Sequence, residues 1–449
     1  MRECLLINQQ IKITTSPAIN AFSQKTGWFV SSMLFFAVMS SYISTELFSI
    51  NLGFMQISLF RIMVILLPLV CCKRIIINYI EQGYFFGNKT NRYSIIFMLF
   101  WLFYALLSLL WSPSFYDTVR HTYFILCGVV CIVAFSLLTE DLRNISTCLM
   151  AAVIMIFVHG IIGWREVFTG NYVVETEYTL NYALQMLPVS SMFNVNDYAT
   201  CMTVGMFLSY ALWKTAQSRF ISAFAFVVMI NSALLVVWSR SRANIYGLVL
   251  AMLVLIFLSG KKIIVNLFII FISLISAVFV VNLLCPWIME LVTDVVLPGI
   301  TGIDLESGSD YVRTNLIKNG LHFLPQNLFM GTGAGGIEHW MSSEWIYDTG
   351  GIINIHNWWM EILTGYGIII FIGYLLFYIK LVVDMYTTYK TSKDKTEIYI
   401  ALSMIGALVA FSIGSVSSSS NISNYSIWVF FAIAIAFQGL LIKKNVRLK

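Results

Sequence analysis

Charged residues are scarce in this sequence. Asp, Glu, Lys and Arg make up 11% of its 449 residues, whereas hydrophobic residues make up 59% and the mean hydropathy is +0.82. A soluble globular domain carries about 25% charged residues, so the composition indicates an integral membrane protein instead. The net charge of +5 falls mostly between hydrophobic segments. It therefore indicates membrane orientation and not a nucleic-acid partner.

Cysteine motifs and a leader sequence are also lacking. The eight cysteines form no Cys-x-x-Cys pair and no cluster with histidine, so the sequence indicates neither a disulfide framework nor a zinc site. Residues 1–26 are mixed and polar, and no small-residue cleavage site follows the first apolar segment. We therefore expect that segment to act as an uncleaved anchor.

Apolar segments long enough to cross a bilayer recur along the whole chain. They predict an all-α integral membrane protein, multi-pass in the inner (cytoplasmic) membrane, with a single polytopic domain over residues 1–449. About 12 spans are expected, with both termini in the cytoplasm. We place them at 27–43, 55–72, 94–111, 119–138, 145–164, 198–213, 219–238, 243–259, 263–285, 366–383, 397–415 and 425–442.

Lysine and arginine divide unevenly across this topology. Twenty of the 27 lie in cytoplasmic segments, where lysine outnumbers arginine 14 to 6, as the positive-inside rule allows. Topology favours neither cation, but arginine's planar fork holds phosphate bidentately and keeps its charge in a low dielectric. The external set therefore predicts that the protein handles an anionic group on its outer face. That set consists of Arg61, Arg120, Arg165, Arg240, Arg242, Arg313 and Lys318.

The longest external segment, residues 286–355, is acidic and too long for a bare turn, and loops of that size usually carry function. Within it, Ser309–Leu324 predicts a short amphipathic helix, with Ser309 as N-cap and Pro325 as its end. Gly331–Gly336 then predicts a sharp turn that permits close backbone approach. These residues fit Gly-x-Gly-x-x-Gly, but no hydrophobic strand or βαβ unit surrounds them, so they do not indicate a nucleotide site.

Five external residues are candidates for chemistry. Arg240 and Arg242, in a tight turn between two spans, could grip a phosphate together, or both could snorkel to lipid headgroups. Arg313 in the loop helix could bind the same anion or be an ion-paired surface residue. His356 could be a general base, because an ordinary histidine pKa lies near neutrality, or a group at a helix entry. Asn196 could bind sugar hydroxyls, although the surrounding Asn194–Asp197 could equally form a helix cap.

Taken in order, these motifs resemble the O-antigen ligase and O-antigen polymerase family of polysaccharide-assembly membrane proteins. The resemblance covers residues 194–375 as a core region that includes the external loop 286–355. Its motifs are the Asn-x-Asn before a span, the Ser-Arg pair between two spans, the loop helix with its arginine, the Gly-Thr-Gly turn, and the His-Asn pair followed by Gly-Tyr-Gly. The chain departs from the family pattern at Ala243, where glycine is frequent, and at Val195, where proline is frequent.

The resemblance implies a metal-independent glycosyltransferase that uses an undecaprenyl diphosphate-linked oligosaccharide as donor, a glycan as acceptor, and no cofactor. Arg242 and Arg313 would hold the diphosphate, and His356 would take the acceptor's proton. Arg240, Arg120, Asn196 and Asn357 would contribute to substrate binding. Membrane lipids and other polysaccharide-assembly proteins are the further partners. The sequence has no Asp-x-Asp pair, which agrees with a donor that needs neither nucleotide nor metal.

Three functions remain open from the sequence. The leading one is a polymerase that joins repeat units of an O-antigen, capsule or teichuronic-type polymer at the outer face of the membrane. A ligase that moves the finished glycan to another acceptor would share the donor chemistry. A flippase for lipid-linked saccharide is the alternative from another class. Transporters often show internal repeats and charged residues near the midplane, whereas here the ionisable residues concentrate at the outer rim.

Overall fold

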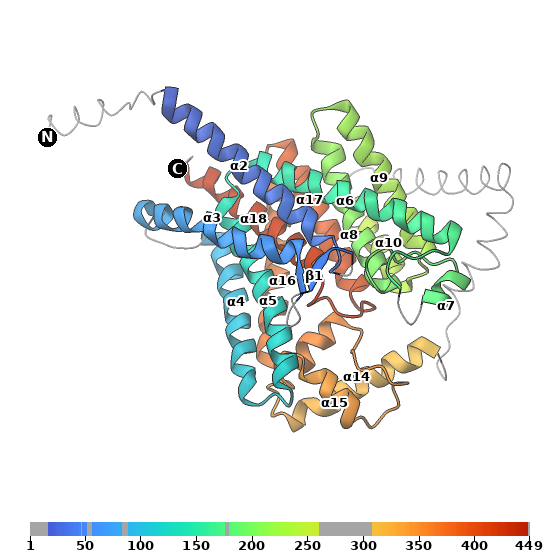
Figure 1. Ribbon diagram of the computed structural model, residues 1–449. Helices are drawn as coiled ribbons and strands as arrows, with labels where there is room; N and C mark the ends of the chain where they lie inside the picture. The colour runs from blue at the N-terminus through green and yellow to red at the C-terminus, as the bar shows by residue number, and fades with distance from the viewer. Residues whose placement is uncertain are drawn as a thin grey trace, which may run out of the picture.

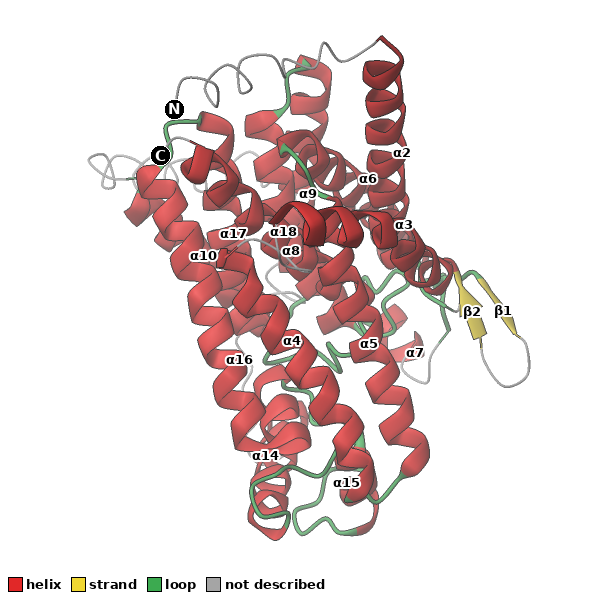
Figure 2. Cartoon of the chain, turned by 90° about the vertical axis from the view of Figure 1, so that its left-hand side faces the viewer, coloured by secondary structure: helices red, strands yellow, loops and turns green. Residues whose placement is uncertain are grey.

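The structure is a computed structural model that describes residues 17–45, 47–51, 56–82, 89–175, 179–259 and 308–447. It is a bundle of long helices, with the helices of residues 308–326 and 336–343 packed at one end (Figure 1, Figure 2). The long helices are α2 (Pro17–Ser41), α3 (Leu59–Gln82), α4 (Lys89–Leu107), α5 (Phe115–Leu138), α6 (Leu142–Thr169), α8 (Val195–Thr215), α9 (Arg219–Trp238), α10 (Arg242–Leu258), α14 (Gly308–Gln326), α16 (Trp358–Thr391), α17 (Lys395–Gly414) and α18 (Tyr425–Arg447). The shorter ones are η1 (Ser108–Leu110), α7 (Thr179–Leu184) and α15 (Gly336–Ser343).

The all-α class expected from composition is confirmed for the described residues. Eleven of the expected spans coincide with helices, and the span placed at 263–285 lies outside the described residues. Six helices are long and apolar enough to cross a membrane, and four more segments are apolar but shorter. The chain is therefore a multi-pass membrane protein. One small antiparallel hairpin of β1 (Ser49–Asn51) and β2 (Gln56–Ser58) was not expected from the sequence.

Helix α18 forms the centre of the bundle. It packs against α5, α4, α16, α6 and α2, and its residues from Ile427 to Phe437 are all buried. A helix that is apolar on every side is buried on every side. The start of α2 and the end of α18 lie at one end of the bundle, and α14 and α15 lie at the other (Figure 2). At that end, residues of α14 and α15 contact the N-terminal parts of α10 and α5.

The loop helix expected at Ser309–Leu324 is present as α14, but its limits differ. It begins at Gly308, so Ser309 lies inside the helix and is not its N-cap. The helix includes Pro325 and ends at Gln326. Pro325 has no N–H to bond the carbonyl four residues earlier, and the helix ends one residue after it. A second loop helix, α15, was missed, since eight residues are too few for a clear apolar period.

The glycine-rich turn packs backbone to backbone against a break in α16. Gly367 leaves the helical conformation, at φ 76° and ψ 178°. The N–H groups of Thr332 and Gly333 donate to the carbonyls of Thr364 and Gly365 at 2.8 and 3.0 Å. A Cβ on Gly331 would lie 2.5 Å from the nitrogen of Gly367, so only glycine permits this approach. The turn thus fixes the external loop to α16.

Candidate active site

The first part of the site is the turn between α9 and α10. Arg240 adopts φ 54°, a left-handed conformation that is strained for a side-chain-bearing residue. Its Nη2 donates to the carbonyl of Gln185 at 2.6 Å, and its Nε is buried without a partner. Burial lowers the pKa of Arg240. Two residues further, Arg242 begins α10 and turns to the external loop instead. The side chains of Arg240 and Arg242 therefore contact different partners, and no contact among the described residues brings the two together at one site.

Arg242 and Arg313 meet at one carboxylate on helix α14. Nη2 of Arg242 lies 2.5 Å from Oδ2 of Asp310, and Nη1 of Arg313 lies 4.0 Å from its Oδ1. Burial lowers the pKa of Arg313, the charge of Asp310 opposes that shift, and the charge of Arg242 adds to it. Two guanidinium groups are thus held beside each other with one carboxylate between them. This is an arrangement that a second anion can join.

His356 stands next to this pair and its ring is kept neutral. Its backbone is left-handed, at φ 49°, and it lies two residues before the start of α16. Burial and then the positive charge of Arg313 lower the pKa of His356 to about 4. The expectation of a pKa near neutrality was therefore wrong for the ligand-free protein, because it ignored both effects. A neutral imidazole can accept a proton at pH 7, and the loss of positive charge beside it would make it a stronger base.

Asn196 and Asn357 both form hydrogen bonds at the N-terminal end of a helix. Asn357 is the N-cap of α16, where its Oδ1 accepts the N–H groups of Trp359 and Met360. Asn194 caps α8 and accepts the N–H of Asn196 at 2.7 Å. The Oδ1 of Asn196 in turn accepts the Ser241 hydroxyl at 2.8 Å. Asn196 thus connects the start of α8 to the turn that carries Arg242, and the structure gives it a positioning contact.

The connection between α17 and α18 brings together polar groups from three helices, which sequence reasoning missed. The Ser417 hydroxyl lies 3.5 Å from that of Ser241, and Ser418 lies 3.0 Å from Thr200. Ser419 donates through its N–H, at 2.8 Å, and through its hydroxyl to Asp197. Ser420 donates to Glu361 on α16 at 2.7 Å. A run of four serines was the available signal, but serine runs also occur in ordinary loops.

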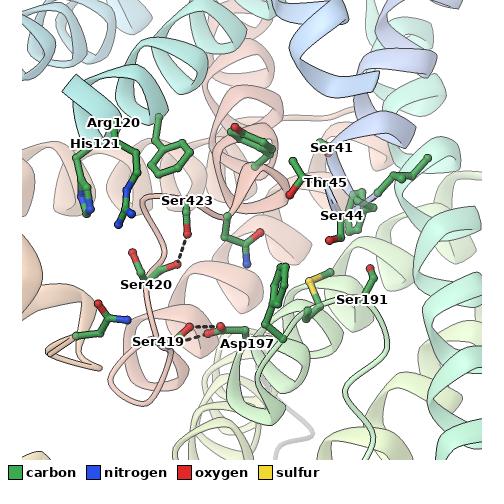
Figure 3. A pocket seen from close by; sticks show the side chains of 18 of the residues that line it. Ser41, Ser44, Thr45, Arg120, His121, Ser191, Asp197, Ser419, Ser420 and Ser423 are labelled. Atoms are coloured by element: carbon green, nitrogen blue, oxygen red, sulfur yellow. Dashed lines mark hydrogen bonds between the residues drawn. The ribbon is translucent and has the colours of Figure 1, made fainter. Parts of the chain in front are cut away.

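Arg120 lies at the same end of the helix bundle as Arg242 and Arg313, but it contacts a different set of residues. Its Nη2 donates to both carboxylate oxygens of Glu338 on α15, at 3.3 and 3.0 Å, and His121 lies 3.3 Å from the same group. Burial alone would raise the pKa of Glu338, but the hydrogen bonds and charges of His121 and Arg120 lower it. These groups line a cavity of about 330 Å³. In Figure 3, Arg120 and His121 project from one wall, and Asp197 with Ser419 lies across the opening from them.

Comparison with known proteins finds a family match over much of this region. Residues 224–375 match the O-antigen ligase family, and that segment contains the α9–α10 turn, α14, the glycine-rich turn and the start of α16. This part of the chain is thus similar to the O-antigen ligase family. The family resemblance drawn from the sequence is thereby confirmed.

One curated relative extends the likeness beyond this domain. The chain is 26% identical over 434 residues to the teichuronic acid biosynthesis protein TuaE of Bacillus subtilis (strain 168), which covers 94% of this chain and 86% of the relative. Five of the candidate residues lie within the O-antigen ligase segment, and Arg120 and Asn196 precede it. The comparisons support a membrane protein of polysaccharide assembly.

Proposed function

We propose that this protein is a polysaccharide polymerase on the outer face of the cytoplasmic membrane. It joins undecaprenyl diphosphate-linked oligosaccharide repeat units into a surface polymer of the O-antigen, capsule or teichuronic type. The observation that carries the proposal is the pair Arg242 and Arg313, held 2.5 and 4.0 Å from Asp310 beside a neutral His356. The match to the O-antigen ligase family and the teichuronic relative support the same chemistry.

The proposed reaction exchanges one glycosidic oxygen for another. A hydroxyl of the acceptor glycan attacks the anomeric carbon of the donor, the bond from that carbon to the phosphate oxygen breaks, and the lipid diphosphate leaves. Arg242 and Arg313 neutralise the charge that builds on the diphosphate. His356 takes the proton of the attacking hydroxyl. The leaving group comes with the donor, so the reaction needs no nucleotide sugar.

Electrostatic coupling between the donor and His356 would make the imidazole more basic when the donor is bound. The charge of Arg313 lowers the pKa of His356 in the ligand-free site. A diphosphate bound at the two arginines brings negative charge to the same place, and negative charge favours the protonated imidazole. Donor binding would therefore raise the basicity of His356 before the acceptor arrives.

Purified protein in lipid nanodiscs tests the function directly. With lipid-linked repeat units as the sole substrate, we expect the glycan to lengthen without nucleotide sugar, ATP or divalent metal, as measured by gel electrophoresis and mass spectrometry. Transfer to a different acceptor lipid, with no lengthening of the repeat-unit chain, would favour the ligase. Movement of intact donor between leaflets without a new glycosidic bond would favour the flippase and contradict the polymerase.

A further inference from the structure

A second candidate binding site lies beside the arginine pair. The cavity of about 330 Å³ lies at the same end of the bundle, yet Arg242, Arg313 and His356 do not line it. Two of its lining residues are close in sequence to the candidate residues: Asn354 lies two residues before His356, and Asp197 follows Asn196. Its volume lies at the low end of the roughly 300–1,000 Å³ typical of small-molecule sites. It is therefore suited to a compact ligand next to the reacting groups.

Arg61 gives this cavity a fixed positive charge. It stands at the start of α3, and its Nε donates to the Tyr425 hydroxyl at 3.3 Å. Its Nη1 donates to the carbonyl of Gln56, and its guanidinium lies 5.2 Å from the ring centre of Tyr123. Three neutral groups thus hold the side chain in one position. Because an orientation fixed in advance lowers the entropy lost on binding, Arg61 is prepared to receive a ligand.

The two arginines that line this cavity differ in their partners. Arg120 is paired with Glu338. None of the ion pairs among the described residues involves Arg61. A half-buried cation without a nearby anion is costly, and a bound anion removes that cost. Asp197 also lines the cavity, but its carboxylate accepts from Ser419. Arg61 is therefore the position at which a ligand's negative charge would be stabilised.

The rest of the lining suits a polyhydroxylated ligand. The hydroxyl of Ser191 is buried, has no hydrogen-bond partner among the described residues and lines the cavity. Asn354 and Asn424 add amides, and Asp197 and Glu338 add carboxylate acceptors for hydroxyl groups. These carboxylates disfavour a ligand with several negative charges, such as a phosphate monoester. Hydroxyl partners on several sides together with one unpaired cation match a sugar that carries a single carboxylate.

We propose that this cavity binds a carboxylate-bearing sugar, such as a hexuronate, with its carboxylate at Arg61 and its hydroxyls at Ser191 and Asp197. In the proposed function, on which this part rests, that sugar belongs to the acceptor glycan. Its binding places an acceptor hydroxyl beside the donor at Arg242 and Arg313. Arg61 thus acts as a specificity residue for the acceptor and not as a catalytic one.

Binding of simple glycosides to the full-length protein in nanodiscs tests the cavity without any transfer reaction. The probes are methyl β-glucuronide and methyl β-glucoside, which differ only in the carboxylate, and saturation-transfer NMR gives their dissociation constants. We expect the glucuronide to bind at least tenfold more tightly. Arg61→Gln should remove that preference and leave glucoside binding unchanged, and Arg61→Lys should keep part of it. Ser191→Ala should weaken both sugars.

Two controls separate this proposal from its rivals. Arg165→Gln changes an exposed arginine that does not line the cavity, so it should leave both dissociation constants unchanged. Arg242→Lys should lower the transfer rate by roughly 10²–10³ and retain glucuronide binding, so the proposed function and this inference can fail separately. Equal binding of the two glycosides, or no binding of either, would overturn the inference. So would an Arg61→Gln effect limited to the retention of anionic lipid, which would make Arg61 a headgroup contact.

Discussion

Arg242 donates to the carboxylate of Asp310 at 2.5 Å, although 68 residues separate the two positions. This contact fastens the start of α10 to the external loop helix α14. The same carboxylate lies near Arg313 on the next turn of α14. Asp310 thus holds two cations together that would otherwise repel each other. A diphosphate could take over that role, with Asp310 as the group that keeps the site assembled while it is empty.

The first prediction concerns Asp310→Asn. Because one negative charge is removed from beside the proposed diphosphate site, undecaprenyl diphosphate should bind more tightly, by roughly tenfold or about 1.4 kcal/mol. Turnover should fall, because Arg242 loses its orienting partner. Binding can be measured by titration of the nanodisc-embedded protein. Weaker binding in this variant would show that Asp310 supports the ligand directly.

The second prediction concerns the two arginines. Arg242→Lys and Arg313→Lys keep the charge but lose the bidentate fork. Each should lower the transfer rate by roughly 10²–10³, or about 2.7–4 kcal/mol, as for loss of one donor to developing charge. Lys318→Ala is the control, since Lys318 lies over the ring of Tyr347 at 5.2 Å and has no proposed role. If both lysine variants form polymer at the wild-type rate, the diphosphate clamp is wrong.

The third prediction concerns the pH dependence of His356. Its pKa of about 4 means that the neutral, proton-accepting form already dominates above pH 4. The kcat/KM profile should therefore show no rise from this group near pH 6.5. Arg313→Gln removes a positive charge that disfavours the imidazolium, so it should raise this pKa, while burial keeps it below 6.5. An NMR titration of the His356 ring measures both values.

Replacement of His356 tests its proposed role as general base independently of the pH profile. His356→Ala should lower the transfer rate by roughly 10²–10⁴, as for loss of a general base. Protein amount and donor binding should remain near wild type, because the arginines hold the diphosphate. A loss of donor binding in place of turnover would assign His356 to binding.

The fourth prediction concerns the glycine-rich turn. Gly331→Ala adds a Cβ 2.5 Å from the nitrogen of Gly367, at a position with φ 81°, so it should destabilise the protein by about 3 kcal/mol or more. Gly350→Ala is the matched control: φ is 60°, but no atom lies within 4 Å of the added carbon. It should cost only about 1–2 kcal/mol of backbone strain. Thermal unfolding in detergent compares them, and equal losses would show that the turn does not secure α16.

The fifth prediction concerns orientation. In a background without native cysteines, Glu344→Cys after α15 should react with a membrane-impermeant thiol reagent in intact cells, or in spheroplasts if an outer membrane intervenes. Lys393→Cys, in the exposed turn between α16 and α17, should react only after the membrane is permeabilised. The lysine distribution predicts this result. The reverse pattern would place the arginine pair in the cytoplasm.

The amino-acid sequence by itself determined the class of this protein and the segments that form its helices. Hydropathy is a local property, and in a bilayer every backbone polar group must be paired within its own helix. An apolar segment of sufficient length therefore becomes a helix whatever surrounds it. The same locality made the turn at Gly331–Gly336 and the helix from Gly308 recognisable. The excess of arginine over lysine at the expected outer face predicted an anionic ligand, and this stays a prediction.

Only the tertiary structure decided which polar groups meet. It separated Arg240 from Arg242, gave Arg242 a partner on α14, and placed Arg120 with Glu338 at the wall of a cavity. It also brought Ser417–Ser420 into contact with α8, α10 and α16. These contacts join residues 55–222 positions apart. They depend on how whole helices pack and on where each chain end turns, and a buried group's pKa depends on the same neighbours.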